Sequence, residues 1–262
     1  MKNIDIKRIK DIVIPITRDE LLSRFAKVER EVKADGSFLT EADLVMQQRI
    51  AGDLIKQWPG TVFLGEEMSV DEQTALLSSD KPVWCLDPLD GTSNFAAGIP
   101  YFSVSLALIV SGKVTQALVY DPIRKECFTA NEKNGAMLND NPLKLTDAGV
   151  GLNHATGLID FKRLDPGLAT RLVTEKPYAS QRSFGSVALD WCWLAAGRCH
   201  LYLHGSSHIW DYAAGNYIFH LAGGFSSTLS GEPIFINKLQ PRSSVAAIDK
   251  ALFKAWSDWL DV

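Results

Sequence analysis

Residues 84–95 have the sequence WCLDPLDGTSNF. An apolar run that resembles a strand ends at Asp87, a proline fixes the following turn, and Asp90 comes three residues later. Gly91 permits unusual backbone angles, and Thr92 stands where a helix could begin. The stretch predicts a tight loop that presents carboxylates, at least one free carbonyl and the amides of a helix start. Such groups bind hard divalent cations and phosphate, although Asp-Pro and Asp-Gly are also ordinary turn formers.

A second apolar run, in residues 63–67 (FLGEE), also ends in acidic residues. By itself this is typical of a strand end with solvated charges. If the two strands are neighbours, however, Glu66, Asp87 and Asp90 converge, and a metal ion relieves their repulsion.

Two further segments place acids near helix starts. Residues 209–215 (IWDYAAG) put Asp211 in the first turn of a predicted helix, where the helix dipole favours an acid. In residues 33–43 (KADGSFLTEAD), Thr40 is a good N-cap, and Asp43 three residues later makes a variant of the capping box. Each segment alone has this structural explanation.

The surrounding pattern predicts an α/β protein with mixed sheets. The first 60 residues are predicted to be helical, with a kink or break at Pro15 and a helix end at Pro59-Gly60. Residues 61–64 and 83–86 are predicted strands, and 102–130 an antiparallel meander. The second half alternates, with strands near 155–159, 178–184, 200–203, 224–229 and 245–248 and helices at 187–196, 210–221 and 250–260. A turn-rich stretch at 139–153 suggests an N-terminal half, 1–145, and a C-terminal half, 146–262, within one compact unit.

Composition excludes several classes of protein. The chain has 262 residues, 46% of them hydrophobic and 22% charged, which is ordinary for a globular protein. A net charge of −4 argues against a general nucleic-acid surface. The four cysteines form no C-x-x-C, and the longest apolar run, 104–110, is too short to span a bilayer. With no signal peptide visible, we expect a cytoplasmic protein without membrane or nucleic-acid partners.

Taken together, the four segments resemble the inositol monophosphatase family of Mg²⁺-dependent, lithium-sensitive phosphatases. The resemblance extends from Lys33 to Gly224, and its central D-P-x-D-G-T-x-N-F motif is highly specific. It implies a layered α/β/α/β/α sandwich, usually a homodimer, that acts on a small phosphorylated metabolite.

The resemblance also implies roles for individual residues. Two or three Mg²⁺ ions would be bound by Glu66, Asp87, the Leu89 carbonyl, Asp90 and Asp211. Thr92, backed by Asp43, would orient a metal-bound water, so that the implied catalytic residues are Thr92, Asp43 and Glu66. The implied substrate-binding residues are Gly91, Thr92, Gly185, Ser186, His204 and Asp211.

One position departs from the family pattern. Members that act on inositol phosphates commonly carry an acid six residues before the Trp-Asp pair, where this chain has His204. We therefore predict a Mg²⁺-dependent phosphomonoesterase for a small phosphorylated polyol or sugar, with inositol monophosphate as the first candidate. The alternatives are a 3′(2′),5′-bisphosphate nucleotidase, a fructose-1,6-bisphosphatase or histidinol-phosphatase of the same superfamily, and a regulatory binding protein that keeps the fold.

Overall fold

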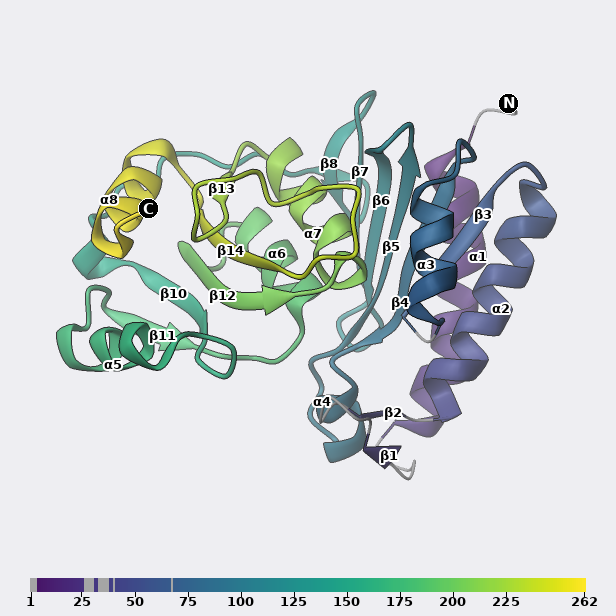
Figure 1. The fold of residues 1–262 in the computed structure, drawn as a ribbon, viewed down its shortest axis with the longest axis horizontal. Helices are drawn as coiled ribbons and strands as arrows, with labels where there is room; N and C mark the ends of the chain where they lie inside the picture. The colour runs from purple at the N-terminus through teal and green to yellow at the C-terminus, as the bar shows by residue number, and fades with distance from the viewer. Residues whose placement is uncertain (1–3, 26–30, 33–37, 40, 67) are drawn as a thin grey trace.

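The computed structural model describes residues 4–25, 31–32, 38–39, 41–66 and 68–262. The predicted N-cap at Thr40 and the Lys33–Asp35 segment therefore lie outside the described residues. The described chain forms two large sheets with helices between and outside them, and a two-stranded sheet of β1 (Glu31–Val32) and β2 (Phe38–Leu39) (Figure 1).

The first large sheet follows the chain order. Its strands β3 and β4 are parallel, and every later neighbour is antiparallel, which confirms the predicted meander. The parallel pair brings the carboxyl ends of β3 and β4 to one edge, as the convergence of the acidic residues requires. In order, the strands are β3 (Val62–Gly65), β4 (Val83–Asp90), β5 (Ser103–Val110), β6 (Lys113–Asp121), β7 (Glu126–Asn131), β8 (Gly135–Leu138) and β9 (Asn141–Pro142).

The second large sheet is mixed. Its first three strands are parallel, and the fourth is antiparallel to both of its neighbours. The ends of the parallel strands therefore also lie at one edge, facing the site described below. Across the sheet the order is β11 (Ser180–Arg182), β10 (Thr156–Asp160), β12 (Leu201–Ser207), β14 (Arg242–Ala247) and β13 (Phe225–Ser227).

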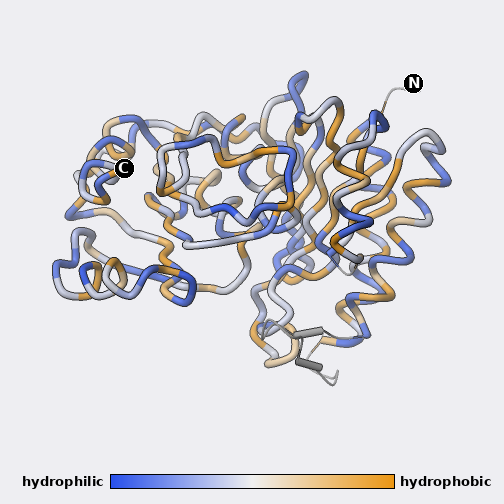
Figure 2. Tube along the Cα trace, in the orientation of Figure 1, coloured by the Kyte–Doolittle hydropathy of each residue, from blue (hydrophilic) through white to orange (hydrophobic). Residues whose placement is uncertain are grey.

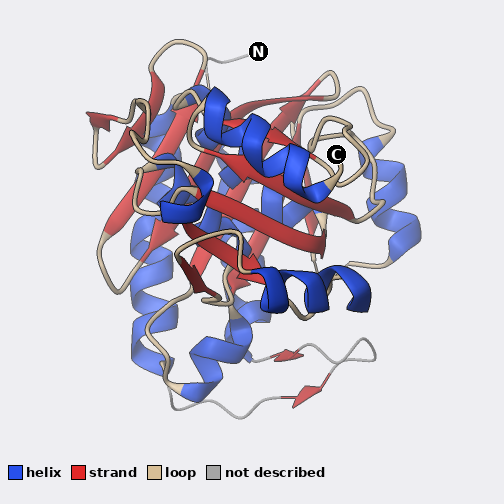
Figure 3. Ribbon diagram, turned by 90° about the vertical axis from the view of Figure 1, so that its left-hand side faces the viewer, coloured by secondary structure: helices blue, strands red, loops and turns tan. Residues whose placement is uncertain are grey.

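The helices and sheets alternate in five layers (Figure 1), and Figure 3, which looks onto the side of α5 and α8, shows helices lying in front of the strands. Helices α1 (Ile6–Thr17) and α2 (Glu41–Gln57) cover the outer face of the first sheet. Helices α6 (Val187–Ala195) and α7 (Ile209–Leu221) lie between the sheets, and α5 (Pro166–Glu175) and α8 (Lys250–Leu260) cover the second. The predicted α/β/α/β/α sandwich is thus confirmed.

Three apolar cores hold the layers together. One surrounds α6 and α7 between the two large sheets, one lies between the first sheet and helices α1 and α2, and one lies between the second sheet and helices α5 and α8. Figure 2 shows hydrophobic residues running along the strands of the first sheet, where both faces are covered. Among the described residues no helix is long and apolar enough to cross a membrane.

Of the kink or break predicted at Pro15, the break was wrong. Helix α1 runs through Pro15 to Thr17, and a π-helical turn, Arg18–Leu22, continues it. Proline inside a helix lacks an N–H donor, so one backbone hydrogen bond is lost, and the burial of Val13 and Ile16 on the core face offsets that loss.

Candidate active site

The regular pairing of the first sheet is interrupted at the end of β4. Pairing of β4 with β5 is irregular between Asp87 and Asp90, so the chain leaves the regular ladder there. The Asp87 carboxylate accepts the Leu89 N–H at 2.9 Å. Strand β4 continues to Asp90, so the loop predicted after Asp87 is an irregularity inside the strand. Both aspartates are less than a tenth exposed.

The helix start predicted after this loop is present. Gly91 has a φ of 99° and is the N-cap of the short helix α4 (Thr92–Ala97). A side chain there would be strained, and its Cβ would lie 3.1 Å from the Tyr101 carbonyl oxygen. The Thr92 hydroxyl lies 3.0 Å from the Leu89 carbonyl oxygen and 3.3 Å from Asp43 Oδ1, so helix α2 also reaches the loop.

Asp211 reaches the same place from the other half of the chain. It stands in the first turn of α7 and accepts the His208 N–H at 2.7 Å. A pocket of about 240 Å³ separates the ends of the two sheets. Of the residues predicted for the site, all but Asp43 line this pocket: Glu66, Asp87, Leu89, Asp90, Gly91, Thr92, Gly185, Ser186, His204 and Asp211.

The carboxylates at one end of the pocket raise one another's pKa values. Burial is the largest cause of the raised pKa of Asp87, followed by the charges of Glu66, Asp90 and Asp211. Burial, and then Asp90 and Glu66, raises the pKa of Asp211 in the same way. Burial raises the pKa of Asp90 to about 6, even though hydrogen bonds from Ser186, Ala188 and Val187 lower it. This end of the pocket is therefore strongly unfavourable for negative charge unless a cation joins it.

The donor set fits a hard divalent cation. Carboxylates and a backbone carbonyl are the oxygen ligands that Mg²⁺ prefers, and the buried carboxylates gain from a cation. In the described chain, however, no three His, Cys, Asp or Glu side chains form a ready-made ion site. Asp90 accepts the Val187 and Ala188 amides at 3.2 and 2.8 Å, and Asp211 accepts the His208 amide, so these oxygens face protein donors. Coordination requires the carboxylates to adjust.

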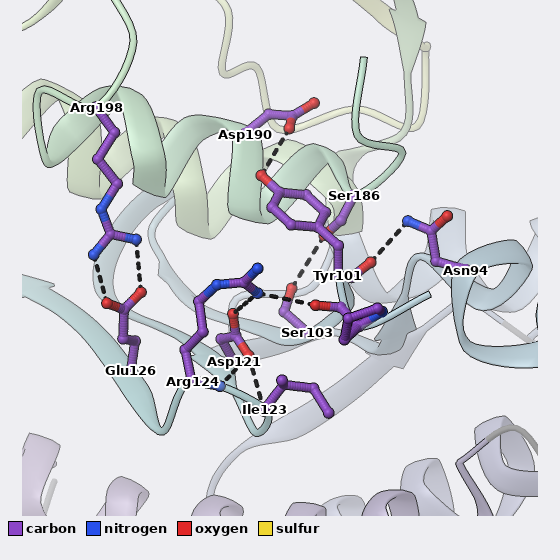
Figure 4. Close-up of polar contacts among 11 residues, drawn as sticks. Asn94, Tyr101, Ser103, Asp121, Ile123, Arg124, Glu126, Ser186, Asp190 and Arg198 are labelled. Atoms are coloured by element: carbon purple, nitrogen blue, oxygen red, sulfur yellow. Dashed lines mark hydrogen bonds and ion pairs between the residues drawn. The ribbon is translucent and has the colours of Figure 1, made fainter. Parts of the chain in front are cut away.

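A second wall of the pocket is tied to the acidic loop by hydrogen bonds. The Asn94 amide donates to the Tyr101 carbonyl at 2.8 Å and to the Phe184 carbonyl at 2.7 Å, and the Ser186 hydroxyl donates to Asp90. Figure 4 shows the hydrogen bond from Asn94 to the Tyr101 carbonyl, the Ser186 hydroxyl 3.5 Å from that of Ser103, and the Tyr101 hydroxyl donating to Asp190 at 3.0 Å. The segment containing Gly185 and Ser186 is thereby held against the loop.

Sequence reasoning missed Asn94 and Asp190 as pocket residues. Asn94 lies inside the 84–95 motif and could have been found there. Asp190 carries no local signal, because only the packing of α6 places it at the pocket.

The far wall was also missed, apart from His204. Asp160, Lys162 and Arg163 line the pocket there. His204 Nε2 lies 3.5 Å from Asp160 Oδ2, and the two residues are register partners on β12 and β10. The available signal was the charged DFKR sequence that directly follows the strand predicted at 155–159.

The chain belongs to the inositol monophosphatase family, whose model matches residues 1–256. Members of this family are phosphatases, and the chain is a phosphoric monoester hydrolase by that membership.

Individual relatives agree with this assignment. The chain is 36% identical to Nus factor SuhB of Pasteurella multocida, over 78% of this chain and 76% of the relative. It is 31% identical to inositol-1-monophosphatase of Mesorhizobium japonicum, over 86% and 84% of the two chains. The crystal structure of extragenic suppressor protein suhB from Bartonella henselae superposes with a TM-score of 0.80 at 28% identity, covering 95% of this chain and 96% of that one.

Proposed function

We propose that the protein is a Mg²⁺-dependent phosphomonoesterase that hydrolyses a small phosphorylated polyol or sugar, with inositol monophosphate as the first candidate. The observation that carries the proposal is the convergence, in one pocket, of a carboxylate cluster from both halves of the chain with a helix start at Gly91. The relative named inositol-1-monophosphatase supports the substrate class. Cytoplasmic location, homodimer formation and lithium sensitivity belong to the same proposal.

The acidic end of the pocket would hold the metal. Its ligands would be Glu66, Asp87, the Leu89 carbonyl, Asp90 and Asp211, which suit two or three Mg²⁺ ions. When bound, these ions would neutralise the phosphate, lower the pKa of a bound water and stabilise the leaving alkoxide.

Thr92 and Asp43 would orient the attacking water. A hydroxyl has one proton, so when the Thr92 hydroxyl donates to Asp43, its oxygen offers a lone pair to an O–H of water. Asp43 is buried, which keeps this pair in one geometry. The water would thus attack in line, opposite the ester oxygen.

Other groups would hold the substrate. The Gly91 and Thr92 amides at the start of α4 would donate to the phosphate, as amides at helix starts do. Gly185 and Ser186, fixed by Asn94 and Asp90, would contact the part of the substrate beyond the phosphate, together with His204.

A regulatory role is the second candidate, because several relatives carry the name Nus factor. Such a role would survive loss of the carboxylate cluster, whereas phosphatase activity would not. Pull-down with an Asp211→Asn variant, which can keep the hydrogen bond from the His208 amide, separates the two.

The test of the proposed function is a panel of phosphate esters assayed with and without Mg²⁺. The panel should include inositol 1-phosphate, fructose 1,6-bisphosphate, histidinol phosphate and a 3′-phosphoadenosine nucleotide, which represent the alternatives. We expect Asp43→Asn to lower kcat about 100-fold. The carboxylate of Asp43 can only accept the Thr92 hydroxyl proton, whereas an amide can donate to the Thr92 oxygen instead and leave the hydroxyl pointing elsewhere.

The matched control is Asp53→Asn, an exposed aspartate on the same helix, which should retain wild-type kcat. Hydrolysis that resists EDTA, or full turnover by Asp43→Asn, would contradict the proposal.

A further inference from the structure

The pocket has a basic end opposite its acidic end. Lys162 and Arg163 line the same pocket as the carboxylates, and both side chains are exposed. In the part of the chain that the structure describes, neither forms an ion pair with a carboxylate. The two cations are therefore available to a ligand in the pocket.

The backbone holds this basic segment in place. Asp160 ends β10 and accepts the Lys162 N–H at 2.8 Å, which turns the chain back over the neighbouring strand. A Cβ on Gly205 would lie only 1.8 Å from the Arg163 carbonyl oxygen, so the backbone at 163 lies directly against β12. The positions of Lys162 and Arg163 beside His204 are thus set by main-chain packing, not by the reach of flexible side chains.

The charge of this wall is positive. Its one lining acid, Asp160, already has His204 Nε2 at 3.5 Å and the Lys162 N–H as partners. Burial alone would raise the pKa of Asp160, but the hydrogen bond and charge of His204, with the Arg163 charge, lower it below its ordinary value. The Arg163 charge also lowers the pKa of Asp211, which places Arg163 within electrostatic range of the acidic end.

We propose, resting on the proposed function, that Lys162 and Arg163 form a subsite for a second anionic group of the substrate. His204 lies beside this subsite and supports its wall, because its Nδ1 accepts the Ser206 N–H at 3.3 Å and its Nε2 lies 3.5 Å from Asp160. Within the proposed class of small phosphorylated polyols and sugars, this subsite would favour an ester that carries a second phosphate over inositol monophosphate. Guanidinium and ammonium groups form strong, charge-assisted hydrogen bonds with phosphate, and a neutral hydroxyl gains less from them.

The test compares two esters that differ only in the second phosphate: fructose 1-phosphate and fructose 1,6-bisphosphate, both with Mg²⁺. The double variant Lys162→Ala/Arg163→Ala should lower the ratio of kcat/KM for the bisphosphate to that for the monophosphate about tenfold. The change should lie in KM, because the subsite is separate from the carboxylate cluster. The conservative variant Lys162→Arg should retain most of the wild-type preference for the bisphosphate.

A matched control removes two positive charges elsewhere. Lys238→Ala/Lys250→Ala changes two exposed lysines outside the pocket and should keep the wild-type ratio. An unchanged ratio in Lys162→Ala/Arg163→Ala, or a ratio that falls equally in the control, would overturn the subsite.

Failure of the proposed function looks different. If no phosphate ester is hydrolysed, calorimetric binding of the same two sugar phosphates decides the question. Tighter binding of the bisphosphate that is lost in Lys162→Ala/Arg163→Ala would keep the subsite and refute the phosphatase, and equal binding would refute the subsite as well.

Discussion

At the scale of single residues, Asp90 and Asp211 differ in the number of backbone amides that donate hydrogen bonds to them. Asp90 accepts the Val187 and Ala188 amides at the start of α6, which stabilises that helix. Asp211 accepts one amide, that of His208. Asparagine has a single acceptor oxygen, so Asp90→Asn leaves either the Val187 or the Ala188 amide facing its NH2 group, whereas Asp211→Asn can keep its one hydrogen bond.

Asp211→Asn should therefore abolish hydrolysis and stabilise the metal-free protein at pH 7. The folded state raises the pKa of Asp211, so it retains a proton that the unfolded chain releases near its ordinary value of about 3.9. Wild-type stability consequently falls as the pH rises above about 4, and the variant escapes that loss. Urea unfolding in EDTA at pH 4 and pH 7 measures the difference, which should be present at pH 7 and shrink at pH 4.

Asp53→Asn, at an exposed position, is the control for the general effect of losing a charge. A stability difference that is the same at both pH values would mean that the repulsion among the pocket carboxylates is not its source.

At the scale of elements, the close approach of α6 and α7 positions Asp211. A Cβ on Gly215 of α7 would lie 2.6 Å from Trp191 Cβ and 3.1 Å from the Ala188 carbonyl oxygen, both on α6. Trp191 is fully buried, so neither helix can move aside without disturbing the central core. The small residues in the segment 209–215 (IWDYAAG) allow this close packing.

Gly215→Ala should thus destabilise the protein by about 1–3 kcal/mol, because the added methyl group forces the helices apart. Gly52→Ala in α2 is the matched control, since a Cβ there meets nothing within 4 Å. That change should stabilise by about 0.5–1 kcal/mol through the better helix propensity of alanine. Denaturant unfolding of both variants checks the pair, and equal effects would show that the contact with Trp191 does not limit the packing.

Two helices were not predicted although their signals are in the sequence. Helix α3 (Val70–Leu77) begins with a capping box of Ser69 and Glu72. Helix α5 begins with Asp165 as N-cap and Pro166 in its first turn. Both helices are short and have no long apolar stripe, so hydrophobic periodicity alone did not reveal them.

At the scale of the whole molecule, the pocket links the two sheets. Glu66, Asp87 and Asp90 come from the first sheet, Asp211 from the central layer, and the Asp160–His204 pair from the second sheet. A cation at the acidic end would therefore bind only to the assembled fold. Whether the chain divides into two halves at residue 145 stays a prediction.

Because unfolded chains do not bring these carboxylates together, Mg²⁺ should raise the unfolding temperature in a concentration-dependent way. Saturation at about 100 times Kd corresponds to about 2.7 kcal/mol of added stability. Ca²⁺ should also stabilise but should inhibit hydrolysis, because its looser coordination positions water poorly. Thermal unfolding across a Mg²⁺ titration, with Asp211→Asn as the low-affinity comparison, measures this linkage. An unfolding temperature that is indifferent to Mg²⁺ would contradict binding at the carboxylates.

The sequence alone determined the local features: the helix start after Gly91, the meander and the acid at the start of α7. These depend on neighbouring residues, through backbone geometry and hydrophobic periodicity, so a linear pattern reveals them. Motif resemblance supplied the layer order and the residue set around the pocket, which the fold brings together.

Only the tertiary structure decided which residues lie across the pocket from the motif residues. Asp160, Lys162 and Arg163 became pocket residues because parallel pairing places Asp160 opposite His204 and because Gly205 lets the 163 backbone lie against β12. Asp190 reached the pocket only through the packing of α6. Contacts between residues tens of positions apart depend on how sheets and helices stack, and no short stretch of sequence encodes that stacking.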